Sequence, residues 1–369
     1  MRSGPRLSGL LTRSLESHVA ARFTDPRLRQ VLGYPAVFLG TAPDRAPSMY
    51  HLMSWMDLAD GVFYPQGGFG TLIDAVARLA RERGARLHTG RTVEQVLTGT
   101  DGPPGRRGAR ASARGVLWRD ADGRREELTA DVVVGAADLH HLETALLPPA
   151  LQTYPPAWWE RRDPGPGGVL ALLGVEGELP ELAHHSLFFT QDWQANFSAI
   201  FDSPTRVPDP ASLYLSRTSA TDPTAAPEGM ENLFLLVPVP ADPALGRGGL
   251  DGAGDAAVEQ VVDASLAQIS RWAGIPDLAD RVRVRRTIGP ADFAEGLNSW
   301  QGGMLGPAHV LSQSAFLRAG NASKKVDRLL YAGYGTRPGI GLPMCLISAE
   351  LVLKRLRGDR SAGPSAVAR

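Results

Sequence analysis

Cysteine is almost absent from this chain of 369 residues, in which Cys345 is the single example. One cysteine excludes an internal disulfide and a cysteine-based zinc cluster. Because Cys345 lies on the apolar face of a predicted helix, a core thiol is favoured over a nucleophile. An excess of charge is also lacking, since 39 basic residues balance 39 acidic ones. The bulk electrostatics therefore indicate no nucleic-acid partner.

Long apolar runs are also absent from the sequence. No apolar segment reaches the roughly 18 residues that a membrane-spanning helix needs. Arg2, Arg6 and Arg13 stand near the N-terminus without a long apolar segment, so this region does not resemble a secretory signal. The hydrophobic content of 43% still allows a large core, and the length indicates about two domains. We expect a cytoplasmic globular protein that attaches peripherally to a membrane surface through the region from Arg2 to Trp55.

The most informative stretch covers residues 329–357. An apolar run at 329–332 predicts a buried strand, and four glycines then predict a loop that lets the backbone approach a ligand: Gly333, Gly335, Gly339 and Gly341. Pro343 suits the first turn of a following helix, which Gly358 terminates. Unpaired N–H groups at that helix start favour an electron-rich or anionic group, although a purely structural turn is equally compatible with the pattern. One apolar stripe runs along the helix: Leu346, Ala349, Leu353 and Leu356.

A second glycine motif begins at Tyr64, where the sequence reads YPQGGFG. It leads into an amphipathic helix closed by Gly84, and residues 86–88 and 91–96 then predict strands. Residues 101–114 are rich in Gly, Pro and Arg and predict a solvated loop. Asp122 and Gly123 form a turn pair suited to a hairpin, and the run at 131–134 predicts a buried strand.

The middle of the chain predicts a mixture of strands and helices. Residues 168–175 and 233–237 predict apolar strands, and residues 212–216 an alternating one. A helix with apolar residues from Val258 to Ile269 ends near Gly274. Residues 25–55 are helical in pattern and punctuated by proline.

Taken together, these segments resemble the bacterial-type phytoene desaturases, which are FAD-dependent carotenoid dehydrogenases. The resemblance runs from about residue 25 to about residue 356. It implies that the glycine loop and the helix start wrap the isoalloxazine ring of FAD, and that the backbone of Val93 contacts the adenine. The cofactor-binding residues that it implies are Val93, Gly333, Gly335, Thr336, Gly339, Gly341, Leu342 and Pro343. Arg337, Ile340 and Met344 depart from the usual residues of the family's signature.

The fold class implied by this resemblance is α/β, namely an FAD-dependent oxidoreductase fold of the amine-oxidase and glutathione-reductase type. Its expected parts are a helical lobe that faces membrane and substrate at 1–62, a discontinuous FAD-binding domain at 63–139 and 291–358, a β-rich substrate domain at 140–290, and a tail at 359–369. Residues 7–22 have apolar residues at helical spacing, which favours a surface helix over a membrane-lying one.

One part of the family pattern is missing. A dinucleotide-binding enzyme needs a strand, GxGxxG and a helix, and no such motif occurs in the sequence. The string from Gly252 to Ala257 follows a loop instead of a strand, so we discard it. The N-terminal dinucleotide-binding (Rossmann) unit is therefore expected either in a longer form of the chain or in a separate polypeptide.

The implied function is dehydrogenation of phytoene or a related carotene, with a lipophilic polyene as substrate. Two alternatives stay open: a related carotenoid oxidoreductase such as a ketolase, isomerase or saturase, and a catalytically silent fragment or subunit. Asp292 could accept a proton, but a capping or loop role is at least as compatible with its position. His184 and His185 have titratable rings but no third ligand at metal-site spacing. We assign no catalytic base from the sequence.

Overall fold

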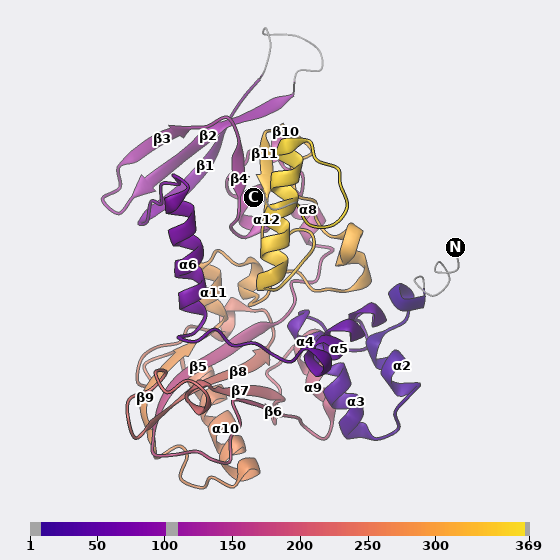
Figure 1. Ribbon diagram of the computed structural model, residues 1–369, viewed down its shortest axis with the longest axis vertical. Helices are drawn as coiled ribbons and strands as arrows, with labels where there is room; N and C mark the ends of the chain where they lie inside the picture. The colour runs from indigo at the N-terminus through magenta and orange to yellow at the C-terminus, as the bar shows by residue number, and fades with distance from the viewer. Residues whose placement is uncertain (1–8, 101–109, 366–369) are drawn as a thin grey trace. The chain divides into compact units, whose positions relative to one another are not determined.

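The computed structural model describes residues 9–100 and 110–365, and the chain forms two compact units (Figure 1). Unit 1 comprises Met1–Leu87, Gly165–Gly296 and Gln301–Met304. Unit 2 comprises His88–Pro164, Leu297–Trp300 and Leu305–Arg369. Both units are thus built from separated segments. Residues 63–87, which the sequence analysis groups with the FAD-binding domain, lie in unit 1.

The N-terminal part of unit 1 is helical. Its helices are α2 (Leu15–Ala20), α3 (Pro26–Gly33), α4 (Pro35–Phe38), α5 (His51–Ala59) and α6 (Phe69–Glu82). The continuous helix expected at 7–22 is wrong, because Ser14 has extended backbone and caps α2 by accepting a hydrogen bond from the Ser17 amide at 3.2 Å. Leu7 lies outside the described residues. Leu15 and Val19 are buried in a small core, so the apolar side of α2 is not a free surface.

A five-stranded antiparallel sheet forms the rest of unit 1. Its strands are β5 (Gly167–Glu176), β6 (His185–Phe188), β7 (Leu213–Arg217), β8 (Met230–Val239) and β9 (Val282–Ile288), in the order β6-β7-β8-β5-β9. The associated helices are α9 (Trp193–Phe201), α10 (Ala256–Ala273) and α11 (Pro290–Gly296). The expected strands at 168–175, 212–216 and 233–237 are confirmed, as is the helix that Gly274 ends in a left-handed conformation.

Alternation along these strands separates two faces of the sheet. Val169, Ala171 and Leu173 are buried in one core with Val258 and Val262 of α10. Because successive residues of a strand point to opposite faces, the residues between them lie on the other face. One face of the sheet is therefore closed by α10.

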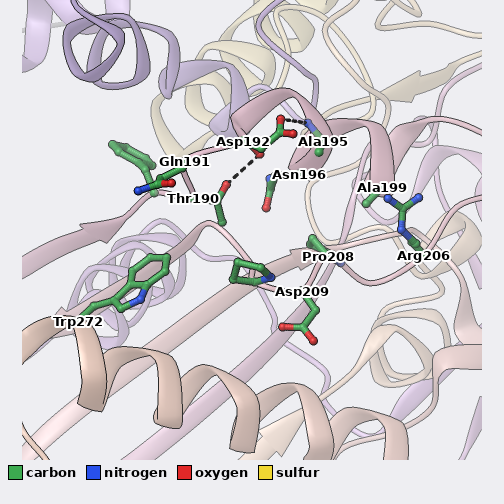
Figure 2. A pocket seen from close by; sticks show the side chains of 12 residues that line it. Thr190, Gln191, Asp192, Ala195, Asn196, Ala199, Arg206, Pro208, Asp209 and Trp272 are labelled. Carbon is green, nitrogen blue, oxygen red and sulfur yellow. Dashed lines mark hydrogen bonds between the residues drawn. The ribbon is translucent and has the colours of Figure 1, made fainter.

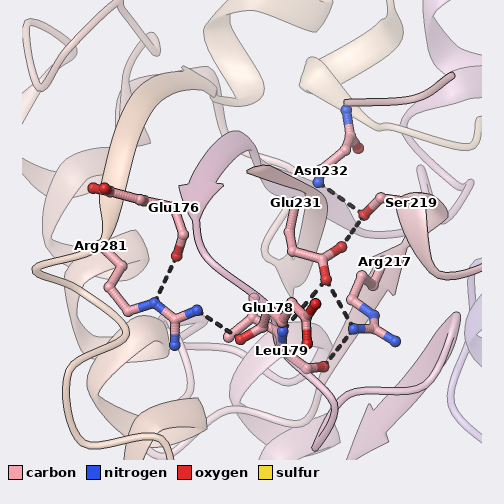
Figure 3. A network of polar contacts seen from close by, with 8 residues as sticks. All are labelled: Glu176, Glu178, Leu179, Arg217, Ser219, Glu231, Asn232 and Arg281. Atoms are coloured by element: carbon pink, nitrogen blue, oxygen red, sulfur yellow. Dashed lines mark hydrogen bonds and ion pairs between the residues drawn. The ribbon is translucent and has the colours of Figure 1, made fainter. Parts of the chain in front are cut away.

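A network of charged groups ties the sheet to its connections (Figure 3). The buried carboxylate of Glu231 in β8 accepts hydrogen bonds from the Arg217 guanidinium at 3.0 Å and from the Leu179 amide at 3.3 Å. Arg217 also donates to the Leu179 carbonyl at 2.6 Å. Arg281 donates to two further carbonyls nearby, those of Glu176 and Glu178, each at 2.7 Å. This arrangement compensates the buried charges and fixes the segment that follows β5.

Unit 2 contains two separate sheets. Its strands are β1 (Arg91–Thr100), β2 (Ala111–Asp120), β3 (Arg125–Thr129), β4 (Val133–Gly135), β10 (Val326–Asp327) and β11 (Leu329–Tyr331). Its helices are α7 (Leu139–Thr144), α8 (Pro156–Trp159) and α12 (Leu342–Arg357). One sheet has the order β1-β2-β10 with β3 beside β2, and in the described residues the other consists of the parallel pair β4 and β11.

Short 3-10 helices complete both units. They span Ser48–Tyr50, Pro149–Leu151, Thr218–Ala220, Pro243–Leu245, Trp300–Gly302, Leu311–Gln313 and Ala315–Leu317. Among residues 9–100 and 110–365, no helix has both the length and the apolar character needed to cross a membrane.

Several local expectations in unit 2 can be compared directly with the structure. The hairpin at Asp122 and Gly123 is confirmed, and Gly123 has a positive φ of 83°. The strand expected at 86–88 is wrong, since regular pairing starts only at Arg91. Residues 101–109 of the expected loop lie outside the described part of the chain, and the expected loop end at 114 is wrong because β2 already begins at Ala111.

Candidate functional site

The glycine loop leaves the end of a parallel strand pair. Leu329–Tyr331 pairs with Val133–Gly135, and the Ala332 amide then donates to the Gly135 carbonyl at 3.0 Å. In open α/β sheets, ligands bind beyond the carboxyl ends of parallel strands. The loop from Gly333 to Gly341 therefore starts at the position where such a fold places a ligand.

The four glycines of the loop fall into two kinds. A Cβ atom on Gly339 would lie 2.2 Å from a ring carbon of His309, and one on Gly335 would lie 3.0 Å from the Leu139 Cβ. These two glycines are required by packing inside unit 2. At Gly341 the nearest atom to an added Cβ is the Met344 Cγ, at 3.9 Å, and at Gly333 it is the Ala136 carbonyl oxygen at 3.6 Å. Gly341 and Gly333 are thus the loop glycines with room beside the backbone.

Positive φ angles also require glycine at three of these positions. The φ values are 103° at Gly333, 144° at Gly339 and 109° at Gly341. An L side chain rarely adopts such a conformation. Gly341 therefore combines a conformational need for glycine with open space, which is the combination expected where a flat ligand lies against the backbone.

Thr336 holds the loop from inside. Its side chain is buried, with 1% exposed, and its hydroxyl bonds with the Gly333 carbonyl at 3.1 Å and the Ser348 hydroxyl at 3.0 Å. The Ser348 hydroxyl in turn accepts a hydrogen bond from the Gly333 amide at 3.0 Å. Asn321 donates to both hydroxyls, at 3.2 Å and 3.0 Å. The side chain of Thr336 therefore shapes the loop and is enclosed by the protein.

Arg318 is the residue that links the loop to the preceding segment. Its buried guanidinium donates to the carbonyls of Tyr334 at 2.6 Å and Thr336 at 3.2 Å, both in the loop. It also donates to the carbonyls of Pro307 at 3.0 Å and Gln313 at 3.2 Å. Five N–H donors in a rigid plane allow one guanidinium to satisfy several carbonyls at once. Arg318 thereby fixes the backbone path of the glycine loop.

His309 packs against the same loop. Its Nε2 accepts a hydrogen bond from the Ile340 amide at 3.3 Å, and its ring occupies the space beside Gly339. Burial lowers the pKa of His309 to about 3, and the positive charge of Arg318 acts in the same direction. The imidazole is therefore neutral at physiological pH, as its role as an acceptor requires.

The start of α12 offers N–H groups to a ligand. Gly341 is the N-cap, no side chain caps the helix, and Pro343 lies in the first turn. Leu342 is half-buried, whereas Gly341 and Pro343 are exposed. The Cys345 amide is already bonded to the Gly341 carbonyl at 2.9 Å, which leaves the amides of Leu342 and Met344 without helical partners. The positive end of the helix dipole therefore lies next to the open side of Gly341.

These features fit the ring of a flavin. A planar, electron-rich heterocycle can lie against Gly341, where a Cβ would meet no close neighbour. Its carbonyl edge can accept hydrogen bonds from an uncapped helix start. Gly341, Leu342 and Pro343 would hold the ring, while Thr336, Gly335 and Gly339 act through the shape of the loop. For the pyrophosphate of a dinucleotide, by contrast, the sequence holds no strand–GxGxxG–helix unit.

The apolar stripe of α12 is exposed. Leu346 is 56% exposed, Leu353 39% and Leu356 50%. The buried residues of the helix are Ser348, Val352 and Lys354. Cys345, expected in the core, is a half-buried free thiol. The apolar side of α12 is therefore an exposed surface among the described residues.

Val93, the residue expected near the adenine, lies in β1 opposite Trp118 of β2. Its side chain is 36% exposed. The register shifts between Val93 and Gln95, so a bulge lies at this point of the strand. Its contact with a nucleotide stays a prediction.

Two carboxylates behind the loop are structural. Asp138 caps α7 by accepting from the His141 amide at 3.1 Å, and it accepts from the Tyr334 hydroxyl at 2.9 Å. Glu143 accepts from the Tyr154 amide at 2.9 Å and from the Tyr331 hydroxyl. Burial raises the pKa of Glu143 and, more strongly, that of Tyr331. Both carboxylates have partners that fix the strand ends carrying the loop.

Asp292 has a structural role in unit 1. Its carboxylate accepts hydrogen bonds from the amides of Gly248 and Gly289, each at 2.7 Å. The loop role allowed by the sequence is therefore the one that the structure shows. His184 and His185 also use one ring nitrogen each within unit 1, toward the Thr221 hydroxyl at 2.6 Å and the Tyr214 hydroxyl at 2.7 Å.

A row of apolar side chains crosses the second face of the five-stranded sheet. The strand registers place Leu187 opposite Tyr214, Tyr214 opposite Leu236, Leu236 opposite Leu170, and Leu170 opposite Ile288. All five lie on the face away from the α10 core, and all are half-buried or exposed. With neighbouring strands about 4.8 Å apart, the row is about 19 Å long. We refer to these five residues as the apolar row.

A separate hollow of about 590 Å³ in unit 1 has a different character (Figure 2). Arg206, Asp209 and Trp272 lie around it. The Asp192 carboxylate on its wall already accepts from the Ala195 amide at 2.9 Å, and the Thr190 hydroxyl donates to the Asp192 carbonyl at 3.2 Å. None of the residues implied as cofactor contacts lines this hollow.

Comparisons with known proteins concern the family and the fold. The family described as flavin containing amine oxidoreductase matches residues 4–352. A carotenoid 3,4-desaturase of Haloarcula japonica is 37% identical over 94% of this chain and 65% of the relative. A zeta-carotene-forming phytoene desaturase of Myxococcus xanthus is 34% identical over 93% of this chain and 62% of the relative. The chain thus spans less than two thirds of the length of these relatives.

Among solved structures, an oxidoreductase from Methanosarcina mazei has a TM-score of 0.59 at 16% identity, covering 93% of this chain and 68% of that one. At this identity the likeness concerns the fold. It supports the expected α/β fold.

Proposed function

Because this chain belongs to the flavin-containing amine oxidoreductase family, we propose that it is the flavin-ring and substrate part of an FAD-dependent carotene desaturase. Its substrate would be phytoene or a related lipophilic polyene. The names of the relatives from Haloarcula japonica and Myxococcus xanthus support this substrate class. The two relatives also extend well beyond the matched part, which is consistent with a dinucleotide-binding unit outside these 369 residues.

The observation that carries this proposal is the apolar row of unit 1. The five members of the row come from five different strands, and four of them are aliphatic. A long hydrocarbon offers no hydrogen bonds, so a site for it can gain affinity only by burying apolar surface. A row of about 19 Å that crosses the strands matches an extended hydrocarbon chain better than a compact polar ligand.

The chain's own contribution to the reaction is orientation. When bound, FAD supplies the two-electron acceptor for dehydrogenation. The Arg318 and Asn321 contacts hold the glycine loop in one path, and the start of α12 favours negative charge beside Gly341. The apolar row excludes water from the polyene. Apolar contacts along the row would select which carbon atoms are presented for oxidation.

The dinucleotide-binding unit would dock on unit 2. The exposed leucines of α12 flank the parallel pair of β4 and β11, and parallel sheets are normally covered on both faces. A strand and helix supplied from a longer chain or from a separate polypeptide would extend the sheet and cover Leu346 and Leu353. The added strand and helix would also contribute the pyrophosphate-binding loop that the present sequence lacks.

The helical part of unit 1 is proposed as the membrane-facing surface. Large apolar side chains are exposed on α5 and just after it, among them Trp55, Leu58 and Phe63 at 59%, 79% and 81%. Exposed apolar surface of this extent marks a membrane or protein contact. A hydrophobic polyene resides in lipid, so peripheral attachment would give the enzyme access to its substrate.

Product analysis tests the proposed function. The chain, joined to the part of the Myxococcus xanthus relative that extends beyond the match, is incubated with phytoene in liposomes. Formation of products with longer conjugation is expected. Conversion of already desaturated carotenes without any action on phytoene would contradict the assignment and favour a different carotenoid oxidoreductase.

A variant tests the apolar row itself. Leu236→Asn places a polar group at its centre and should lower turnover of phytoene while leaving flavin content unchanged. Leu128→Asn, at an exposed position in β3 of unit 2, is the matched control. Equal turnover in both variants would show that the row does not hold the substrate.

A further inference from the structure

A groove in the helical part of unit 1 has an apolar floor. It lies among α2, α3 and α5 and has a volume of about 690 Å³. Its apolar lining consists of Leu10, Val19, Phe23, Leu32, Trp55 and Leu58. Val19 belongs to a buried cluster against which Leu32 packs, whereas Trp55 and Leu58 are exposed. The groove is therefore open on one side and anchored in the fold on the other.

The charged and titratable side chains of the lining are all basic. Arg13, Arg22, His18 and His51 line the groove, and no aspartate or glutamate does so among the described residues. The guanidinium of Arg13 donates to the Ser17 carbonyl at 2.6 Å, and that of Arg22 donates to the His18 carbonyl at 2.8 Å. These bonds tether both side chains to α2. A guanidinium has five N–H donors, so each retains capacity for an anion.

The four basic groups are close enough to influence one another. The rings of His18 and His51 stack at 4.8 Å between centroids. Burial lowers the pKa of His18, and the charges of Arg22, His51 and Arg13 lower it further. An anion between the arginines would relieve this repulsion, which favours a negatively charged ligand over a neutral one.

The surface around the groove is apolar as well. Leu52 and Met56 of α5 are 54% and 48% exposed, and Leu28 and Val31 of α3 are 46% and 54% exposed. A water-soluble amphiphile would fill the groove but leave this surface in water. A bilayer would cover both, because exposed apolar residues insert beside the headgroups while arginines reach the phosphates.

We propose that this groove binds an anionic phospholipid of the membrane surface, with its phosphate between Arg13 and Arg22 and one acyl chain along the apolar floor. The inference rests on the membrane attachment included in the proposed function and adds a lipid class and the residues that select it. Arg13 and Arg22 provide the preference for negative charge. Trp55 and Leu58 provide affinity for any bilayer.

Co-sedimentation of the full chain with vesicles tests this site. One set of vesicles contains phosphatidylcholine alone, and a second contains phosphatidylcholine with phosphatidylglycerol. The chain should bind the anionic vesicles more tightly. Each arginine near an anionic surface contributes roughly a five-fold gain in affinity, so Arg13→Gln/Arg22→Gln should remove a preference on the order of 30-fold.

Two further variants separate charge from apolar contact. Arg83→Gln/Arg86→Gln removes two exposed arginines from another part of unit 1 and should leave the preference intact. Trp55→Ser/Leu58→Ser should weaken binding to both kinds of vesicle. Circular dichroism of each variant should match that of the parent, because the replaced side chains are exposed.

The outcomes distinguish selectivity for anionic lipids from membrane attachment as such. Equal binding of the parent to neutral and anionic vesicles would overturn the lipid selectivity while membrane attachment stands. No binding to either kind would overturn both. Tight binding of monomeric oleate without any preference among vesicles would identify a fatty-acid groove and contradict a bilayer site.

Discussion

The two units differ in how completely they cover their sheets. In unit 1, five antiparallel strands bury one face against α10, and residues such as Leu235 and Val262 form a continuous core. In unit 2, the described part of the parallel sheet has only β4 and β11, and the leucines of α12 remain exposed. Parallel strands normally lie in larger sheets covered on both faces. Both units have a buried core, and they differ in the exposed leucines of α12, which fit the proposal that a further strand and helix pack on unit 2.

Removal of Arg318 should have the largest effect on unit 2. Arg318→Met would leave four carbonyls without their donor, including those of Tyr334 and Thr336 in the glycine loop. A buried carbonyl that loses its hydrogen-bond donor costs about 1–3 kcal/mol, so the loop of unit 2 should lose at least that much stability. Hydrogen exchange of residues 333–341 should become much faster, while exchange in β5 and β8 of unit 1 stays unchanged. Arg318→Lys should recover part of the protection. Unchanged exchange in Arg318→Met would show that the loop holds its path by other contacts.

Truncation of leucines tests the comparison between the units directly. Leu235 is fully buried in β8, and Leu235→Ala should lower the free energy of unfolding of unit 1 by about 2–5 kcal/mol. Leu346 is exposed on α12, so Leu346→Ala should change the stability of the isolated chain by no more than about 0.5 kcal/mol. Denaturant unfolding followed by segment-resolved hydrogen exchange gives both values. A large loss in Leu346→Ala would mean that α12 is already covered.

Acid should weaken unit 2 through His309. Its pKa falls from the ordinary 6.5 to about 3 in the folded chain because of burial. Between these values the unfolded chain binds a proton that the folded chain does not, so stability falls as the pH falls from 6.5 toward 3. The slope is roughly 1.4 kcal/mol per pH unit for one such group. The free energy of unfolding of the parent should therefore fall more steeply with decreasing pH than that of His309→Gln, and the two slopes should differ by this amount. Parallel curves would contradict the burial of a neutral ring.

Substitution of Gly341 should affect the site more than the fold. Its φ of 109° and ψ of 151° are essentially restricted to glycine, and the strain for another residue is on the order of 1–3 kcal/mol. Gly341→Val should shift the loop and fill the open space, and the flavin content of the completed protein should fall by a factor of about 5 to 150, which corresponds to that strain. Gly296→Val, at an open position without positive φ, is the control. Normal flavin content and turnover in Gly341→Val would place the cofactor elsewhere.

Local patterns in the sequence predicted much of the fold. The strand from Leu329, the helix between Gly341 and Gly358, and the hairpin at Gly123 follow from residues that act on their immediate neighbours. Periodicity in the middle of the chain likewise located β5, β8 and α10. Glycine and proline are informative here because they restrict the backbone independently of distant contacts.

Distant contacts explain what the sequence did not reveal. No local pattern marks Arg318 or Asn321, whose partners become close only when the loop folds back on them. The periodicity of α12 indicated an apolar stripe but not whether the chain itself covers it. Ser14 likewise interrupts the helix expected at 7–22, because its hydroxyl oxygen accepts a hydrogen bond from the Ser17 amide. The spacing of apolar residues does not indicate this local alternative.

Flavin binding by the isolated chain tests the central claim most directly. Purified chain is mixed with FAD, separated from free FAD by gel filtration, and its absorption spectrum is compared with that of the chain joined to a dinucleotide-binding unit. The isolated chain should be colourless, because the pyrophosphate has no helix-terminus cradle in this sequence. The joined protein should carry one FAD per chain. A stoichiometric flavin spectrum from the isolated 369 residues would contradict the proposal that unit 2 is completed by a further dinucleotide-binding unit.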